Sequence, residues 1–282
     1  MKNNQQDIND DEIRFISSSG RVNSRQKNYK LLVRIGIIAV AVIAAIVALW
    51  LLLRTFGMYT SDNYIVADYD AVMNREQIGE KPACVRIDTV VDGFGLTILT
   101  PYNATPVLEI GKSVEKDTTA VLYAQAADVR ADNETIACMF VLKGELISRG
   151  EAKAGFCSII DGNITVGVAD ASPMLEQVLT NEGYFFRQFP LVVANQVVEN
   201  KLKGRYMRKA LAERADGICV VISHEAMTMG DFSQVLVDAG VRNAIYLTGG
   251  SSLSGYKDAS GKITRFGKRR YDFEYENYIV WR

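Results

Sequence analysis

One stretch near the N-terminus constrains the fold more than any other feature of the sequence. From Ile35 to Leu53 every residue is apolar or glycine, and Leu31 to Val33 extend the run on its N-terminal side. This length reaches the roughly 20 residues that a helix needs to cross about 30 Å of hydrocarbon. A buried core helix would carry a polar stripe, and a cleaved signal peptide would be shorter. We therefore predict a transmembrane signal-anchor helix over residues 31–54, in contact with membrane lipid.

The charges beside this helix predict its orientation. Basic residues gather on its N-terminal side, at Arg14, Arg21, Arg25, Lys27, Lys30 and Arg34. On the other side Arg54 stands alone until Arg75. Because short loops rich in Lys and Arg stay in the cytoplasm, the N-terminus is predicted to be cytoplasmic. The chain is then a single-pass protein of the inner membrane whose C-terminal part lies in the periplasm.

Composition divides the rest of the chain. Residues 1–30 are rich in Asn, Gln, Asp and Ser and are predicted to be a disordered cytoplasmic tail. Residues 55–82 are interpreted as a juxtamembrane connector, and residues 83–282 as one exported domain. The formal net charge of the 282 residues is -1 and the pI is about 6.0, which argues against nucleic acid as a partner.

The cysteine and histidine content argues against a metal centre. Four cysteines lie in apolar contexts, at Cys84, Cys138, Cys157 and Cys219, and are expected to be small buried side chains. The chain has no CxxC motif and a single histidine, His224, which follows a strand-like run. A zinc site needs several such ligands. We expect neither a metal nor another cofactor.

The exported part alternates short strands with a few helices. Three turns predict β-hairpins, at Asp92-Gly93, Asp161-Gly162-Asn163 and Asn195-Gln196. Helices are predicted over 117–130, 173–179 and 231–239 from the spacing of their apolar residues. Strands are predicted over 136–142, 218–223 and 244–247. The fold class is therefore α+β, a mixed sheet rich in hairpins with packed helices, preceded by one transmembrane helix.

A glycine-rich loop is the best chemical candidate. The predicted strand Ala244 to Leu247 leads directly into Gly249, Gly250, Ser251 and Ser252. Backbone N–H groups in such a loop can converge on an anion, and serine hydroxyls add donors, which suits phosphate. The same residues also occur in ordinary turns.

This loop resembles a family signature. Asn243-Ala-Ile-Tyr-Leu-Thr-Gly-Gly-Ser-Ser252 is similar to the "nAlnLDGGGSS" motif of the phosphodiester glycosidase family. Further segments resemble the family in the same order: Phe140–Leu146 ("aiNGGfF"), Ser158–Gly162 ("iidGk"), Phe189–Val193 ("gPlLV") and Met207–Ala212 ("pRtaiG"). The resemblance spans roughly Asp117 to Tyr256 and is closest to bacterial members. It implies an exported enzyme of the N-acetylglucosamine-1-phosphodiester alpha-N-acetylglucosaminidase type.

The resemblance also implies site residues. Arg208 would be the basic residue of an anion site, and Gly249, Gly250, Ser251 and Ser252 would bind phosphate. Thr248 stands where the family has an aspartate, and threonine cannot serve as an acid, base or metal ligand at neutral pH. Glu145 is the carboxylate nearest the altered NGG position. The catalytic candidates are therefore Arg208, Glu145 and Thr248.

Two classes of function remain. The first is a membrane-anchored hydrolase that acts on a sugar-phosphate diester of an envelope glycan. The second is a non-catalytic envelope protein that binds glycan or phosphate and has lost the aspartate at Thr248.

Overall fold

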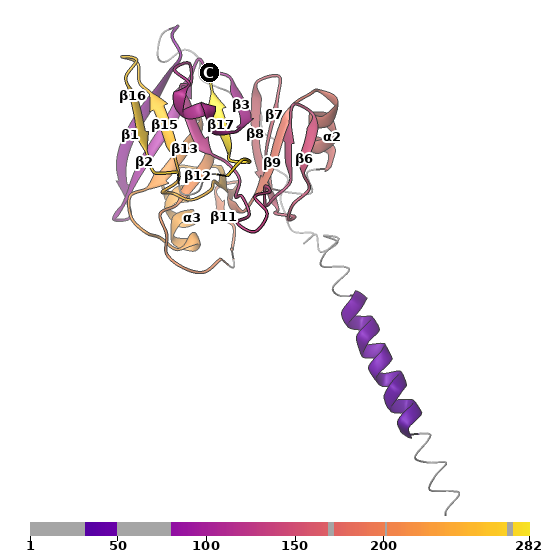
Figure 1. The fold of residues 1–282 in the computed structure, drawn as a ribbon. Coiled ribbons are helices and arrows are strands. Elements are labelled where there is room, and N and C mark those ends of the chain that lie inside the picture. Colours follow the sequence, from indigo (N-terminus) through magenta and orange to yellow (C-terminus); the bar gives the residue numbers. More distant parts are fainter. Residues whose placement is uncertain (1–31, 50–79, 169–171, 201, 270–272) are drawn as a thin grey trace, which may run out of the picture. The chain divides into compact units, whose positions relative to one another are not determined.

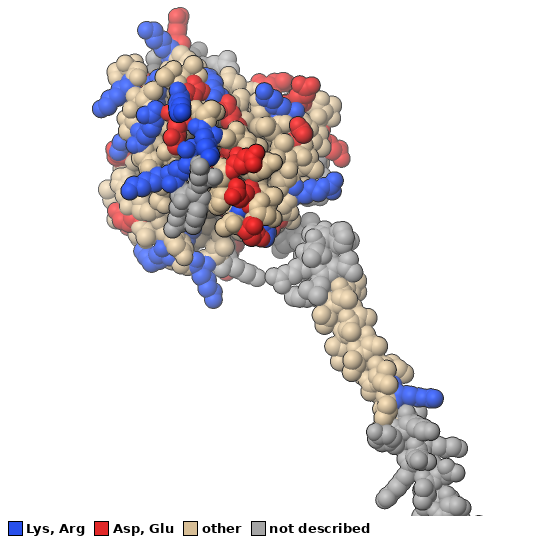
Figure 2. Space-filling view, viewed as in Figure 1, with Lys and Arg blue, Asp and Glu red and all other residues tan. Residues whose placement is uncertain are grey.

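The computed structural model describes residues 32–49, 80–168, 172–200, 202–269 and 273–282 (Figure 1). It divides into two units, Met1–Thr60 and Ser61–Arg282. In the first unit, Leu32–Leu49 forms a helix long and apolar enough to span a membrane, which fits a single-pass anchor or a signal sequence. Its surface is almost free of charge (Figure 2). The predicted tail and nearly all of the predicted connector lie outside the described residues.

The second unit is built on a seven-stranded sheet, in which each strand pairs antiparallel with its neighbours. Its order across the sheet is β1 (Ala83–Val91), β2 (Phe94–Tyr102), β13 (Gly217–Ser223), β12 (Lys209–Arg214), β14 (Asn243–Tyr246), β10 (Pro190–Val193) and β11 (Gln196–Val197).

Two five-stranded antiparallel sheets complete this unit. One has the order β16 (Ile263–Phe266), β15 (Ser254–Lys257), β4 (Leu122–Gln125), β17 (Asn277–Trp281) and β3 (Pro106–Ile110). The other has the order β6 (Glu145–Ser148), β5 (Phe140–Leu142), β9 (Tyr184–Gln188), β7 (Gly155–Ile160) and β8 (Asn163–Val168). Three short helical segments each connect two strands of the same sheet: the 3-10 helix Lys112–Lys116, α2 (Ser172–Thr180) and α3 (Met229–Asp238). The predicted α+β class is confirmed.

The seven-stranded sheet is buried on both faces, and its side chains alternate between two cores. Leu211 and Val220 pack with side chains of the two smaller sheets, such as Ile279. Ala210 and Val221, which point to the opposite face, pack against α3 through Phe232. Because both faces of these central strands are covered, β12 to β14 are almost continuously buried.

The three predicted hairpins are present. Asp92 and Gly93 have φ values of 51° and 82°, and Asp161 and Gly162 have φ values of 49° and 77°. A turn with two consecutive residues at φ > 0 has a backbone twist that matches the right-handed twist of the flanking strands. The third turn uses Ala194 and Asn195, one residue earlier than predicted. The β-hairpin content was therefore readable from the turn residues.

Of the predicted helices, two are confirmed and one is wrong. The second and third correspond to α2 and α3, and Thr228 caps α3 by accepting a hydrogen bond from the Asp231 N–H. The helix predicted over 117–130 does not form, since Leu122–Gln125 is strand β4 between β15 and β17. Successive residues of β4 are buried on both faces of its sheet, so the sequence lacks the alternation of polar and apolar residues that is typical of a strand. The spacing of its small apolar residues therefore matched that of a helix face.

The four cysteines are buried, as predicted, and none of them forms a disulfide. Burial raises the pKa of all four thiols, which for Cys138 and Cys219 reaches about 12. They therefore act as small apolar side chains.

Candidate functional site

The glycine loop lies at the end of the central strands of the seven-stranded sheet, between the end of β14 and the start of β12. Thr248 ties it to the chain before Asp128, because its N–H donates to the Ala126 carbonyl at 3.1 Å and its hydroxyl oxygen lies 3.2 Å from the same carbonyl. Gly250 presses against the peptide between Met207 and Arg208, where any Cβ would collide with backbone atoms. The loop therefore needs glycine at this position for close packing.

Most N–H groups of the loop are already bonded within the protein. Gly249 donates to the Tyr246 hydroxyl at 3.1 Å, and Gly250 donates to the Met207 carbonyl at 3.0 Å. Ser252 donates to the Gly249 carbonyl at 2.9 Å. The predicted convergence of N–H groups on an anion is therefore not seen, and the side chain left exposed in the loop is Ser251.

A buried lysine fixes the far end of the loop. The Lys209 ammonium donates to the carbonyl and hydroxyl of Ser252, at 3.1 and 3.0 Å, and to the Ser254 hydroxyl at 2.6 Å. The Ser252 hydroxyl in turn donates to the Thr248 carbonyl at 2.7 Å. Burial without a carboxylate partner lowers the pKa of Lys209 to about 7. Lys209 thus positions the loop through serine oxygens.

A carboxylate that sequence reasoning missed lies beside Thr248. The Thr248 hydroxyl donates to Asp128 Oδ1 at 2.9 Å. The other oxygen, Oδ2, accepts from Lys153 Nζ and from Gln188 Nε2, both at 3.2 Å. Lys153 and Gln188 are buried and bonded to each other, whereas the Asp128 side chain is 39% exposed. Asp128 is thus held firmly on one side and is open to solvent on the other.

Tyr246 lies near this carboxylate, and Arg208 lies near Tyr246. Burial and the charge of Asp128 raise the pKa of the Tyr246 phenol, while the Gly249 N–H and Arg208 lower it. Arg208 itself is buried, and its Nε and a terminal nitrogen donate to the carbonyls of Met227 and Gly204, at 3.0 and 2.9 Å. The predicted Arg208 therefore lies beside the loop, but much of its guanidinium already holds the chain.

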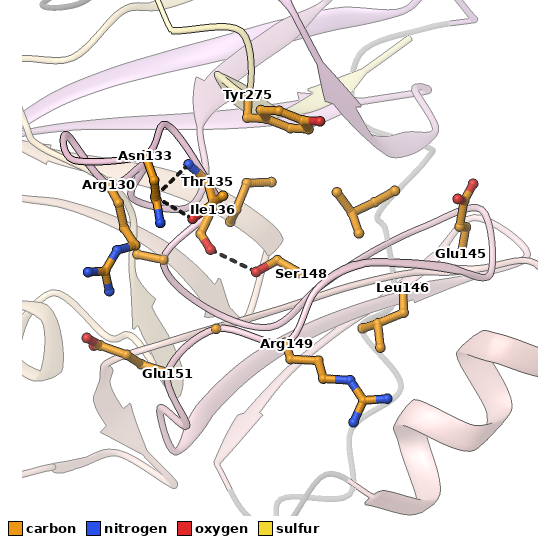
Figure 3. Close-up of a pocket in the computed structure, with 13 residues that line it drawn as sticks. Arg130, Asn133, Thr135, Ile136, Glu145, Leu146, Ser148, Arg149, Glu151 and Tyr275 are labelled. Carbon is orange, nitrogen blue, oxygen red and sulfur yellow. Dashed lines mark hydrogen bonds between the residues drawn. The ribbon is translucent and has the colours of Figure 1, made fainter. Parts of the chain in front are cut away.

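Glu145 lies elsewhere. It is exposed at the turn between β5 and β6, on the rim of an open groove of about 780 Å³ that also contains Tyr275 and Ser148. Figure 3 shows Glu145 at one end of this groove and Arg130 and Glu151 at the other. Within the described part of the chain, no hydrogen bond or ion pair joins Glu145 to the loop.

The opposite end of the groove adjoins Asp128. Ala137, which lines the groove, donates its N–H to the Asp128 carbonyl at 2.8 Å. The Tyr275 carbonyl accepts from Asn277, whose side chain also bonds the backbone of Ala127. Both walls of the groove are thus fixed to the segment that carries Asp128.

Asp128, Lys153 and Gln188 come from three distant segments, and no motif marks them. The one available signal in the sequence was that Asp128 is a charged residue directly after the mostly apolar run from Ala120 to Ala127. Site residues often lie at the end of such a run. Because a helix was predicted over 117–130, the position of Asp128 after a strand was not recognised. In the described part of the chain, no group of three His, Cys, Asp or Glu side chains is close enough to hold a metal ion.

Comparison with known proteins identifies a family and a similar fold. A family model described as phosphodiester glycosidase matches residues 118–278. The fold is similar to that of the catalytic domain of zebrafish N-acetylglucosamine-1-phosphodiester alpha-N-acetylglucosaminidase, auto-inhibited by its pro-peptide, with a TM-score of 0.53, 12% identity, and coverage of 79% of this chain and 99% of that chain. A hypothetical protein from Synechocystis has a TM-score of 0.47, 12% identity, and coverage of 70% and 61%. A search of curated proteins finds no match.

Proposed function

The chain belongs to the phosphodiester glycosidase family, and from this premise we propose that it hydrolyses a sugar-phosphate diester with Asp128 as the reacting carboxylate. The observation that carries the proposal is the hydrogen bond of 2.9 Å between the Thr248 hydroxyl and Asp128. Thr248 occupies the position of the aspartate that the resemblance leads one to expect. Asp128, a carboxylate from a different segment, therefore lies next to the position of the family aspartate.

One carboxylate is sufficient for this reaction. Water attacks the anomeric carbon, the bond from that carbon to the phosphate oxygen breaks, and the phosphate monoester leaves with the electron pair. The second pKa of a phosphate monoester is about 6, so it leaves at neutral pH without a proton from a general acid. Asp128 accepts the proton of the attacking water. The exposed face of Asp128 gives water and sugar access to it.

The neighbouring groups supply orientation and charge. Lys153 and Gln188 hold Asp128 Oδ2, which leaves Oδ1 directed at Thr248 and the loop. The Tyr246 hydroxyl lies at the loop, where it accepts from the Gly249 N–H at 3.1 Å, and we assign it and the Arg208 guanidinium as the donors to the leaving phosphate. The groove beyond Ala137 would receive the remainder of a glycan.

We place this activity at the cell envelope. The apolar helix Leu32–Leu49 would anchor the chain in the inner membrane, with the N-terminus in the cytoplasm and the second unit in the periplasm. The substrate would be a sugar-phosphate diester of an envelope glycan.

A binding protein without turnover is the second candidate. One observation favours it: the aspartate of the family motif is replaced by Thr248. Such a protein would retain sugar phosphodiester and release no product.

The test is hydrolysis of the methyl phosphodiester of N-acetylglucosamine 1-phosphate by wild-type protein and by Asp128→Asn. Loss of a general base lowers the rate by about 10² to 10⁴, and we expect kcat to fall within this range. Asp161→Asn is the matched control, since Asp161 lies in the exposed β7–β8 turn at φ 49°, where Asn is tolerated. Equal rates for all three proteins would refute the role of Asp128. Binding without hydrolysis by the wild type would favour the second candidate.

A further inference from the structure

A second cavity, of about 470 Å³, lies against the glycine loop at Gly250 and Ser251. Its lining also includes Arg86 in β1, Thr97 in β2, the end of β13 and two residues of β16. Asp128, Lys153 and Gln188 do not line it. We propose that this cavity is a separate binding site for one neutral sugar residue. The size is within the range of small-molecule sites, about 300 to 1,000 Å³.

The apolar part of the cavity suits the carbon face of a sugar ring. Phe266 presents a partly exposed ring, and Met207 and Ile222 continue the apolar surface. Phe266 is itself supported by Tyr256, with ring centroids 6.3 Å apart. An aromatic ring that is held in place offers a large contact area without ordering cost on binding.

The polar part is a prearranged network of donors and acceptors. Arg86 binds Asp88 through two nitrogens, at 3.0 and 2.9 Å, and the Thr97 hydroxyl donates to the same carboxylate at 2.6 Å. Hydrogen bonds to Tyr256 and to Asp88 raise the pKa of Arg86. Asp88 uses only part of the guanidinium, so donors remain for a ligand. Because Asp88 offsets the charge of Arg86, the network suits hydroxyl groups better than a phosphate.

His224 completes the network and has a defined tautomer. The Thr97 hydroxyl gives its proton to Asp88, so the His224 Nε2, 2.9 Å away, must be the donor to Thr97. The opposite nitrogen, Nδ1, lies directly over Gly95, where a Cβ would come within 2.5 Å of it. Gly95 and Thr97 therefore fix the imidazole at the wall of the cavity. The hydroxyls of Ser251 and Thr264 are the further polar groups of the lining.

The inference does not depend on catalysis at Asp128. It requires only that the loop separates two sites. Thr248 in the loop bonds to Asp128, and Ser251 in the same loop lines the cavity. A glycan would then be held by one sugar at this cavity, whether or not the protein turns it over.

The single histidine makes the test direct. Full-length protein in lipid nanodiscs, purified with a tag that contains no histidine, gives one histidine signal in NMR, from His224. The probes are the methyl glycosides of glucose, galactose and mannose, with inorganic phosphate titrated in parallel. We expect at least one glycoside to shift the His224 signal with saturation, and phosphate to leave it unchanged.

Three variants decide the interpretation. Arg86→Ala should weaken the fitted Kd by about tenfold or more, the usual effect of losing a hydrogen bond from a charged donor. Phe266→Ala should also weaken it, because the ring that would contact the sugar is removed. Asp128→Asn should leave the Kd unchanged. No shift with any glycoside, a shift with phosphate instead, or equal Kd values for wild type and Arg86→Ala would overturn the proposal.

Discussion

Lys209 makes the stability of the folded domain depend on pH in a direction unusual for a lysine. Its ammonium is fully buried among Ser252 and Ser254 oxygens, and burial lowers its pKa from 10.5 to about 7. The charged form is therefore disfavoured in the folded state and not in the unfolded state. Between pH 7 and 10.5 the unfolded chain binds more protons, so the free energy of unfolding rises with pH.

The size of the effect follows from this difference in pKa. At 1.36 kcal/mol per pH unit, the full penalty below pH 7 is about 5 kcal/mol, and it disappears above pH 10.5. Raising the pH from 7 to 9 should then increase the free energy of unfolding by about 2 kcal/mol. Lys209→Met replaces lysine by an apolar side chain of similar length and removes the titrating amine.

The assay is urea unfolding of a fragment beginning at Ser61, at pH 7, 8 and 9, for the wild type and Lys209→Met. Other groups titrate equally in both proteins, so the difference between their free energies of unfolding at each pH reports the titration of Lys209 alone. The advantage of Lys209→Met should shrink by about 2 kcal/mol from pH 7 to pH 9. A difference that stays constant with pH would refute the lowered pKa, and a difference that grows would reverse its sign.

Three further predictions concern the anchor, the domain and the loop. A membrane-impermeant thiol reagent should label Arg75→Cys and leave Asn9→Cys unlabelled in intact cells, and the reverse pattern would contradict the proposed orientation. The fragment beginning at Ser61 should be soluble and unfold in one cooperative step followed by circular dichroism, since it contains all the described core clusters, and aggregation without the helix would count against an independent domain. Gly250→Ala should lower the free energy of unfolding by about 1 to 3 kcal/mol, because its Cβ collides with the Met207–Arg208 peptide, and an unchanged urea midpoint would show that this packing is not required.

The sequence predicted those features that depend on neighbouring residues. The turns at Asp92-Gly93 and Asp161-Gly162 were found because few residues adopt φ > 0. Helix α3 was found from its apolar spacing and the glycine that follows it, Gly240, at φ 78°. The division of the strands into three sheets was not predicted, because pairing partners such as β4 and β17 are far apart in the chain.

The candidate site was predicted only where the sequence resembles the family motifs. The loop from Thr248 to Ser252 and Arg208 lie close together, as the family resemblance implied, since Gly250 packs on the Arg208 peptide. The role of Asp128 was missed because its partners Lys153 and Gln188 come from other segments and reach it only after folding. Glu145 was selected for its position in an aligned motif, and the structure places it on an exposed turn.

The position of the broken bond tests the central claim, that a phosphate leaves from the sugar carbon while Asp128 activates water. The methyl phosphodiester of N-acetylglucosamine 1-phosphate would be hydrolysed by the wild type in water enriched in oxygen-18, and the label followed by phosphorus-31 NMR and mass spectrometry. We predict that oxygen-18 enters the sugar and none enters the phosphate, and that Asp128→Asn slows its incorporation by about 10²-fold or more. Oxygen-18 in the phosphate would mean that the phosphorus–oxygen bond breaks, and it would contradict the account.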